Sequence, residues 1–256
     1  MITAGIDVGT GSIKVLILDG DQVLSKVRFI SEMEESKGIE SAFDDALSKA
    51  GIGADSVAFV TATGSGAKNA LNAHETITDI TSAAKGTSYL IPETRTVIDV
   101  GSEEARAVKC DGAGDVLDFA TNEKCAAGAG AFIEAMARAV ETDFEQFVSL
   151  YFESDKDIPL NAQCAVFAES EVVSLINSEA TTADISRAIN RAIAERTSSM
   201  TRRVGVEQKV VLIGGVALNA GFVDALGKFL KTEITLSEDP IFVNALGAAL
   251  IGRERS

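Results

Sequence analysis

The sequence predicts an α/β protein built from two related halves with a cleft between them. Strand and helix patterns alternate along all 256 residues, which favours mixed α/β layers. The segment Asp7-Val8-Gly9-Thr10 is echoed by Asp99-Val100-Gly101-Ser102, and each follows an apolar strand. A chain of this length can bury a large core as one large domain or two smaller ones. The echo favours a duplicated fold.

The first half begins as strand, glycine turn and strand. Gly9-Thr10-Gly11-Ser12 separates two apolar runs, and Asp19-Gly20-Asp21 is a hairpin turn into a third strand. A helix follows, because apolar residues recur at steps of about four from Ile39 to Ala50. The expected elements are Ile2–Val8, Ile13–Leu18, Gln22–Phe29, the helix 39–50, the strand Ser56–Thr61 and the helix Thr78–Leu90, which ends before Pro92.

The second half starts on the same plan. Two strands form a hairpin around Asp111-Gly112-Ala113-Gly114, and a helix follows with Phe132, Met136 and Val140 on one stripe. The expected elements are Thr96–Val100, Ala105–Cys110, Val116–Phe119, helices around 132–140, 168–177 and 182–204, strands 209–213 and 234–236, and the helix Asn244–Arg253. We expect an N-terminal unit at 1–90, a second unit at 91–240, and a C-terminal helix at 241–256 that packs back on the first unit.

Composition excludes several functions. Hydrophobic content of 46% and charged content of 24% are typical of a globular protein, and the net charge of −15 argues against nucleic acid or anionic membrane as a partner. No apolar run reaches the ~18 residues of a membrane span, and Met1 leads almost directly into a strand without a signal peptide. Three widely spaced cysteines predict no disulfide framework, so a reducing cytoplasm is the expected compartment. His74 is the only histidine, which excludes His-rich metal sites, and we expect it to be an ordinary loop residue, which argues against Ser-His-Asp catalysis.

Three elements can converge on a nucleotide. Gly9, Thr10, Gly11 and Ser12 can turn backbone N–H groups toward phosphate oxygens, and Asp7 just before them can hold Mg²⁺ through water. The second element repeats this arrangement with Asp99, Gly101 and Ser102. The third, Gly214-Gly215 followed by Val216-Ala217-Leu218-Asn219, comes after an apolar strand and admits the adenosine side. Lys14 is either a phosphate contact or a solvated strand residue. Each element alone also fits an ordinary hairpin or turn, and none is a Walker A loop.

Two cysteines raise a further possibility. Cys125 and Cys164 each lie in a short loop of small residues that leads into a helical pattern, and a helix N-terminus favours the thiolate that binds metal. Two thiolates fall short of the four that an iron–sulfur cluster normally takes, but two subunits together supply four. The spacing alone favours the other interpretation, in which both are small buried residues, as free cysteines usually are. Cys110, at a strand end before a turn, is expected to be structural.

The order of the phosphate elements resembles the ATPase core shared by actin, Hsp70-type chaperones and sugar kinases. Within it the chain resembles, over nearly its whole length, the iron–sulfur ATPase family of 2-hydroxyacyl-CoA dehydratase activators and benzoyl-CoA reductase ATPase subunits. The segments that carry this resemblance are Gly5-Ile6-Asp7-Val8-Gly9, Thr61-Ala62-Thr63-Gly64, Val97-Ile98-Asp99-Val100-Gly101, Lys124-Cys125-Ala126-Ala127-Gly128, Cys164-Ala165-Val166-Phe167-Ala168-Glu169-Ser170-Glu171 and Gly214-Gly215-Val216-Ala217.

The resemblance implies an actin-like ATPase that uses ATP, Mg²⁺ and one [4Fe–4S] cluster bound by Cys125 and Cys164 between two subunits. It also implies nucleotide contacts at Gly128 and Asn219. We expect electron transfer driven by ATP hydrolysis, since a cluster between two ATPase clamps couples nucleotide state to cluster potential. A ferredoxin-type donor would supply the electrons, and reduction of the acyl-CoA would occur on other subunits.

One departure points to a particular branch. Dehydratase activators usually carry Gly-Gly-Gln-Asp after the second phosphate strand, whereas this chain has Gly101-Ser102-Glu103-Glu104. That version resembles the smaller ATPase subunit of benzoyl-CoA reductase, which pairs with a paralogous ATPase subunit, and it makes Glu103 a candidate for holding water or Mg²⁺. The expected function is therefore an electron-transfer subunit of a benzoyl-CoA reductase. The alternatives are an activator of a 2-hydroxyacyl-CoA dehydratase, a small-metabolite kinase and a nucleotide sensor without enzymatic activity.

Overall fold

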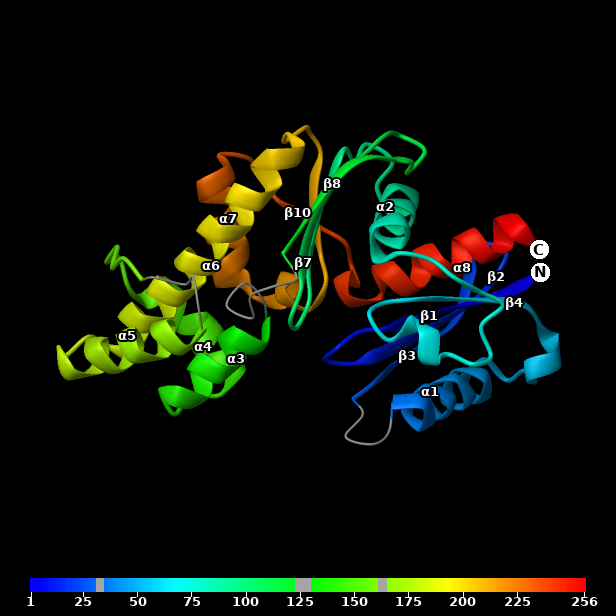
Figure 1. The fold of residues 1–256 in the computed structure, drawn as a ribbon, viewed down its shortest axis with the longest axis horizontal. Coiled ribbons are helices and arrows are strands. Elements are labelled where there is room, and N and C mark those ends of the chain that lie inside the picture. The colour runs from blue at the N-terminus through cyan, green and yellow to red at the C-terminus, as the bar shows by residue number, and fades with distance from the viewer. Residues whose placement is uncertain (31–34, 123–129, 161–164) are drawn as a thin grey trace.

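The first half of the protein is a five-stranded sheet with a helix on each face. The computed structural model describes residues 1–30, 35–122, 130–160 and 165–256. The sheet has the order β3-β2-β1-β4-β5, in which β1 runs antiparallel to β2 and parallel to β4 (Figure 1). Its strands are β1 (Ile2–Val8), β2 (Ile13–Asp19), β3 (Gln22–Phe29), β4 (Val57–Thr63) and β5 (Glu75–Thr76).

The second half repeats this topology. Its sheet has the order β8-β7-β6-β9-β10, with β6 antiparallel to β7 and parallel to β9, which is the pattern of the first sheet strand for strand. The strands are β6 (Thr96–Val100), β7 (Ala105–Cys110), β8 (Val116–Asn122), β9 (Val210–Ile213) and β10 (Thr235–Leu236). The duplication predicted from the repeated Asp-Val-Gly segment is confirmed.

Within the described residues, one α-helix belongs to the first half, a group of helices belongs to the second half, and two helices lie between the two sheets (Figure 1). The first half contributes α1 (Glu35–Ala50), and the second inserts a group of helices between β8 and β9 (Figure 1). These are α3 (Gly130–Ala139), α4 (Phe144–Leu150), α5 (Ala165–Asn177) and α6 (Thr182–Val204), with α7 (Ala220–Leu230) following β9. The pair between the halves is α2 (Asp79–Leu90) and α8 (Val243–Arg255). None of the helices in the described ranges is both long and apolar enough to pass through a lipid bilayer.

Each of the helices α2 and α8 packs against the sheet of the other half rather than the sheet that precedes it in the sequence. Helix α2 follows the first sheet in sequence, yet Ala83 and Ala84 pack against β6, β7 and β9 of the second sheet. Helix α8 ends the chain, and Ala245, Leu246 and Ala249 pack against β2 of the first sheet. The expected return of the C-terminal helix onto the first half agrees with this packing, whereas residues 79–90 pack on the second half. The division at residues 90 and 240 stays a prediction.

The two exchanged helices touch through glycine. A Cβ at Gly247 of α8 would lie 2.7 Å from the carbonyl carbon of Ser82 and 3.0 Å from the amide nitrogen of Gly86, both in α2. Such distances leave no room for a side chain, so the two backbones are in direct contact. This contact lies between the two sheets and joins the halves behind the cleft described next.

Candidate functional site

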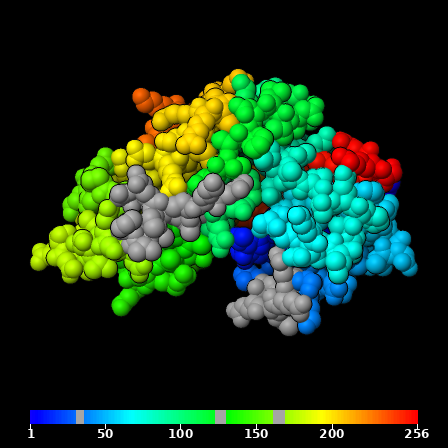
Figure 2. Space-filling view, in the orientation of Figure 1, coloured from blue at the N-terminus to red at the C-terminus, as the bar shows by residue number. Residues whose placement is uncertain are grey.

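A cleft of about 670 Å³ lies between the two halves and is lined by residues from both. The ends of β1 and β6 point into it, as do the turn after β1, the turn after β6 and the segment after β9. In Figure 2 the blue N-terminal residues are visible between the green and cyan parts of the surface. Most of the predicted site residues line this cleft: Asp7, Gly9, Thr10, Gly11, Ser12, Lys14, Asp99, Gly101, Ser102, Gly214 and Gly215.

The turn after β1 lies directly against the turn after β6, because the first turn has a glycine where they meet. Within the first turn, the backbone N–H of Gly9 donates to the carbonyl oxygen of Ser12 at 3.2 Å. A Cβ at Gly11 would stand 2.9 Å from the Cβ of Ser102, so the two turns meet only because residue 11 is glycine. Sequences far apart in the chain therefore form one wall of small residues and backbone groups, which is the kind of surface that phosphate oxygens approach.

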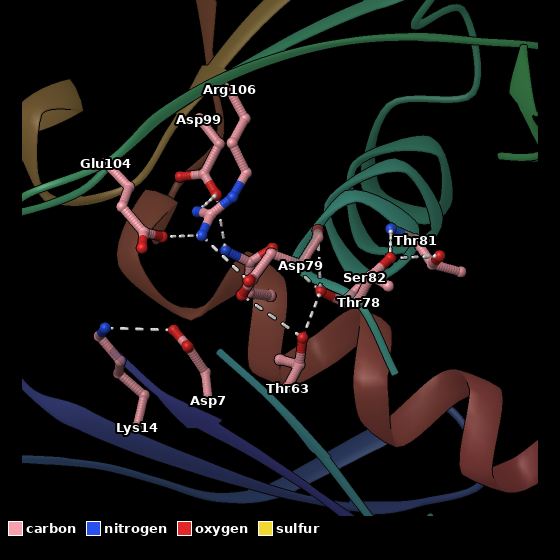
Figure 3. Close-up of polar contacts among 11 residues, drawn as sticks. Asp7, Lys14, Thr63, Thr78, Asp79, Thr81, Ser82, Asp99, Glu104 and Arg106 are labelled. Carbon is pink, nitrogen blue, oxygen red and sulfur yellow. Dashed lines mark hydrogen bonds and ion pairs between the residues drawn. The ribbon is translucent and has the colours of Figure 1, made fainter. Parts of the chain in front are cut away.

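Asp7 and Lys14 form an ion pair on the floor of the first half. They face each other across the β1–β2 pair, and the ammonium nitrogen lies 3.1 Å from the Asp7 carboxylate (Figure 3). Burial raises the pKa of Asp7 to about 6, against the opposing effect of the Lys14 ammonium. Lys14 lines the cleft as one partner of this ion pair, with its side chain 16% exposed, and its predicted phosphate contact stays a prediction.

Asp99 occupies the equivalent place in the second half. It is 2% exposed, and the amide of Asn244, at the start of α8, donates to Asp99 Oδ2 at 2.9 Å. Gly214 lies beside it with a φ of +88°, and a Cβ there would stand 2.6 Å from Asp99 Oδ1. Both the backbone conformation and the close approach require glycine at this position. The first Gly of Gly214-Gly215 thus contributes to the space around Asp99.

Arg106 is the centre of the charged network in the second half. Its guanidinium donates to Asp79 Oδ2 at 3.0 Å, contacts the Glu104 carboxylate, and lies 3.5 Å from Asp99 Oδ2 (Figure 3). Burial lowers the pKa of Arg106, but the surrounding carboxylates outweigh this effect and hold the pKa above its ordinary value. Burial raises the pKa of Asp79, with Arg106 acting in the opposite direction. Arg106 therefore stays charged and connects three carboxylates.

The sequence predictions omit eight polar residues that line the cleft. They are Arg28, Ser65, Asp79, Glu104, Arg106, Glu134, Glu145 and Asn244. Each comes from a different strand, loop or helix, and apart from Glu104, which lies in the turn after β6, no local pattern marks them. The alternation of strand β7 indicates that Arg106 shares a face with buried Val108, which is an unusual place for an arginine and the one signal available.

Two predicted residues stand apart from the cleft lining. Glu103 is not among the described residues that line it, and the neighbouring Glu104 lies there instead. Asn219 is fully buried, where its side chain caps α7 by accepting from the Phe222 N–H and donates to Asn190. This position supports the segment after β9 from behind. The nucleotide roles predicted for Glu103 and Asn219 stay predictions.

The predicted cluster ligands lie outside the described residues. This holds for Cys125 and Cys164 and also for Gly128. Within the described ranges, no group of three or more His, Cys, Asp or Glu side chains is arranged to hold a metal ion. Cys110 is fully buried, as expected of a structural residue, and burial raises the pKa of its thiol.

The composition of the cleft fits a nucleotide that carries a divalent cation. Six carboxylates and three cationic side chains line it, so a bare triphosphate would meet net repulsion. Oxygen ligands are those that Mg²⁺ prefers, and Asp7 and Asp99 enter from opposite halves. The carboxylates that line the cleft are Asp7, Asp79, Asp99, Glu104, Glu134 and Glu145.

Two duplicated sheets around a shared cleft define the fold of the actin, Hsp70 and sugar-kinase type of ATPase. The fold alone is shared with a ROK hexokinase from Thermus thermophilus, at a TM-score of 0.55 and 18% identity over 100% of this chain and 99% of that one. Residues 4–252 match the model of the BadF/BadG/BcrA/BcrD ATPase family. The chain belongs to this family, and the resemblance noted from its motifs is confirmed.

Named relatives include both kinds of protein that the sequence suggested. An activator of lactoyl-CoA dehydratase from Anaerotignum propionicum is 37% identical over 99% of this chain and 98% of its own length. A benzoyl-CoA reductase subunit from Thauera aromatica is 31% identical over 99% of this chain and 94% of its own. The solved activator of the 2-hydroxyisocaproyl-CoA dehydratase from Clostridium difficile, with bound ADPNP, has a TM-score of 0.93 and 36% identity, covering 100% of this chain and 95% of that one.

Proposed function

We propose that this protein is an ATP-driven electron donor that activates a 2-hydroxyacyl-CoA dehydratase. The observation that carries the proposal is the whole-length similarity to dehydratase activators, at 36–37% identity, together with a cleft whose lining fits a magnesium nucleotide. The identity to the benzoyl-CoA reductase subunit is lower, at 31%. The comparisons thus favour the alternative over the reductase subunit that the Glu103-Glu104 segment suggested.

The residues of the cleft can each be given a role. The backbone N–H groups of Gly9 to Ser12 and of the turn after β6 would bind phosphate oxygens, and Asp7 and Asp99 would hold Mg²⁺ through water. Lys14 and Arg28 would offset phosphate charge from the first half. Arg28 is placed for this because its Nε donates to Ser12 Oγ at 3.3 Å in the first turn.

Nucleotide binding would be coupled to electron transfer by movement of the two halves. A cluster held by Cys125 and Cys164 of two subunits would supply the one-electron chemistry, and those ligands remain a prediction from the family motifs. Driving a two-state switch from 1:99 to 99:1 takes about 5.5 kcal/mol of differential binding. We expect a ferredoxin-type donor, a second ATPase subunit that shares the cluster, and a cytoplasmic location.

A benzoyl-CoA reductase ATPase subunit is the second candidate. The specific observation in its favour is Gly101-Ser102-Glu103-Glu104, since the Glu104 carboxylate lines the cleft and contacts Arg106. In that case the second subunit would be a paralogue, and further subunits would bind the aromatic acyl-CoA. Family membership over the whole chain leaves less support for a small-metabolite kinase or a nucleotide sensor.

The ratio of product to ATP separates the two candidates. The reduced protein is mixed anaerobically either with a 2-hydroxyacyl-CoA dehydratase and its substrate or with the acyl-CoA-reducing subunits of a benzoyl-CoA reductase. An activator should need ATP for one priming electron and then give many enoyl-CoA molecules per ATP. Turnover in the second mixture alone, with ATP consumed in a fixed ratio to product, would contradict the proposal and support the reductase subunit.

A further inference from the structure

A closed circuit of polar side chains connects the cleft to the crossing of α2 and α8. Each member lies within hydrogen-bond or ion-pair distance of the next, and the circuit passes through both sheets and both helices (Figure 3). We define the Arg106 circuit as the six residues Arg106, Asp79, Thr63, Ser82, Asn244 and Asp99.

The circuit begins in the second sheet and ends there. Arg106 on β7 contacts Asp79 in the first turn of α2 at 3.0 Å, and Asp79 Oδ1 is 3.5 Å from Thr63 Oγ1 at the end of β4. Thr63 Oγ1 is 3.2 Å from Ser82 Oγ, which is 3.2 Å from Asn244 Oδ1 on α8. Thus α2 and α8 are each fixed to residues of the cleft.

Half of the circuit is buried and the other half is of intermediate exposure. Thr63 and Ser82 are fully buried, Asp99 is 2% exposed and the Arg106 side chain is 11% exposed. Buried charges of this kind are stable only when they are paired, so moving one member requires the others to follow or lose a partner. At the contact between Gly86 and Gly247, no side chain separates the backbones of the two helices.

We propose that Arg106 is a positioning residue that holds Asp99 in the cleft and, through Asp79, couples the occupied cleft to the arrangement of helices α2 and α8. This inference rests on the proposed nucleotide-binding function and specifies how binding reaches the junction of the halves. Arg106 suits the task because a guanidinium donates in several fixed directions at once, whereas an ammonium is a single point of charge.

Asp79→Asn gives the most direct test, because it weakens the link to α2 while leaving Arg106 beside Asp99. Arg106→Lys keeps the charge, which protects folding, but reaches fewer carboxylates. Lys109→Gln is the matched control: it removes a cation from the same strand, where Lys109 pairs with Glu207 away from the cleft. The readouts are the Kd for the magnesium complex of a non-hydrolysable ATP analogue and amide hydrogen exchange in residues 79–90 and 243–255.

In the wild-type protein and in Lys109→Gln, the analogue should slow exchange in both helices by at least ~threefold, as expected when local opening is suppressed. Asp79→Asn removes one of the carboxylates that line the cleft, so its Kd is measured first and exchange is then compared at saturating analogue. Under that condition α2 should lose most of the slowing. Arg106→Lys should show reduced slowing in both helices.

Two results would overturn the inference by different routes. If the wild-type protein binds the analogue but neither helix changes its exchange rate, or if Asp79→Asn and Arg106→Lys keep the full effect, the coupling role of Arg106 is wrong and the proposed function stands. If the wild-type protein binds no nucleotide, the proposed function fails together with the inference.

Discussion

Gly247→Ala should destabilise the protein at the contact between its two halves. The new Cβ would lie 2.7 Å from the carbonyl carbon of Ser82 and 3.0 Å from the Gly86 nitrogen, so both neighbours are backbone atoms that no side-chain rotation can move. The helices must therefore separate. Overpacking a well-packed site typically costs about 1–3 kcal/mol, and we expect the upper end here.

The helix itself partly offsets this cost. Replacing glycine by alanine inside a helix gains about 1 kcal/mol of intrinsic propensity, which leaves a net loss of about 2 kcal/mol. In a protein of this size each kcal/mol lowers the unfolding midpoint by roughly 2–4 °C, so the midpoint should fall by roughly 4–8 °C. Thermal unfolding followed by circular dichroism measures this shift.

Gly53→Ala is the control for the same chemical change without the contact. Gly53 has an ordinary φ of −89°, and no other atom lies within 4 Å of the position that its Cβ would take. Its midpoint should stay the same or rise slightly. An unchanged midpoint in Gly247→Ala would show that the two helices are not in backbone contact, and the junction described above would have to be abandoned.

Three further predictions concern the cleft, the cluster and acid stability. Asp7→Asn should lower Mg²⁺-ATP turnover at least ~tenfold in the assembled system, because a charged ligand near the phosphates is lost; unchanged steady-state hydrolysis would remove Asp7 from the site. Cys125→Ser and Cys164→Ser should each abolish the iron and sulfide content of anaerobically purified protein while Cys110→Ser leaves it intact, and a full complement of iron in Cys125→Ser would exclude the shared cluster. The hydrogen bonds from Lys156 and Ser154 lower the pKa of Asp184, so its ionised form adds stability above the ordinary carboxyl pKa near 4, and this stability is lost as the pH falls toward the lowered value. The unfolding midpoint of Asp184→Asn should therefore depend less on pH between 6 and 3 than the midpoint of the wild-type protein. Equal pH dependence in the two proteins would contradict this account.

The sequence predicted most of the strands and the duplication, because both depend on local patterns. The predicted strand Ser56–Thr61 runs two residues further in the structure, since Ala62 and Thr63 pair with Ile6 and Asp7 of β1. That extension brings the Thr63 hydroxyl within hydrogen-bond distance of Asp79 and Ser82 of α2. The short strand β5 and the seven-residue helix α4 were not predicted, because elements of this length carry too little periodicity.

The candidate site was predicted in part for a similar reason. Turns such as Gly9 to Ser12 are runs of consecutive small residues, so the sequence alone marks them as candidates, and they do line the cleft. Arg106, Asp79 and Asn244 meet only because α2 and α8 pack on exchanged sheets, which is a property of the whole fold. No pattern within α2 shows which sheet the helix packs against; only the structure shows that Ala83 and Ala84 pack on the second sheet.

The measurement that tests the central claim most directly is single-turnover electron transfer. The anaerobically reduced protein is mixed rapidly with an oxidised 2-hydroxyacyl-CoA dehydratase, and its visible absorbance reports its oxidation. With Mg²⁺-ATP we expect rapid oxidation together with the onset of dehydration activity, and without nucleotide or with Mg²⁺-ADP we expect neither. Oxidation at the same rate with and without ATP would contradict the account, because the cleft would then have no part in driving the electron.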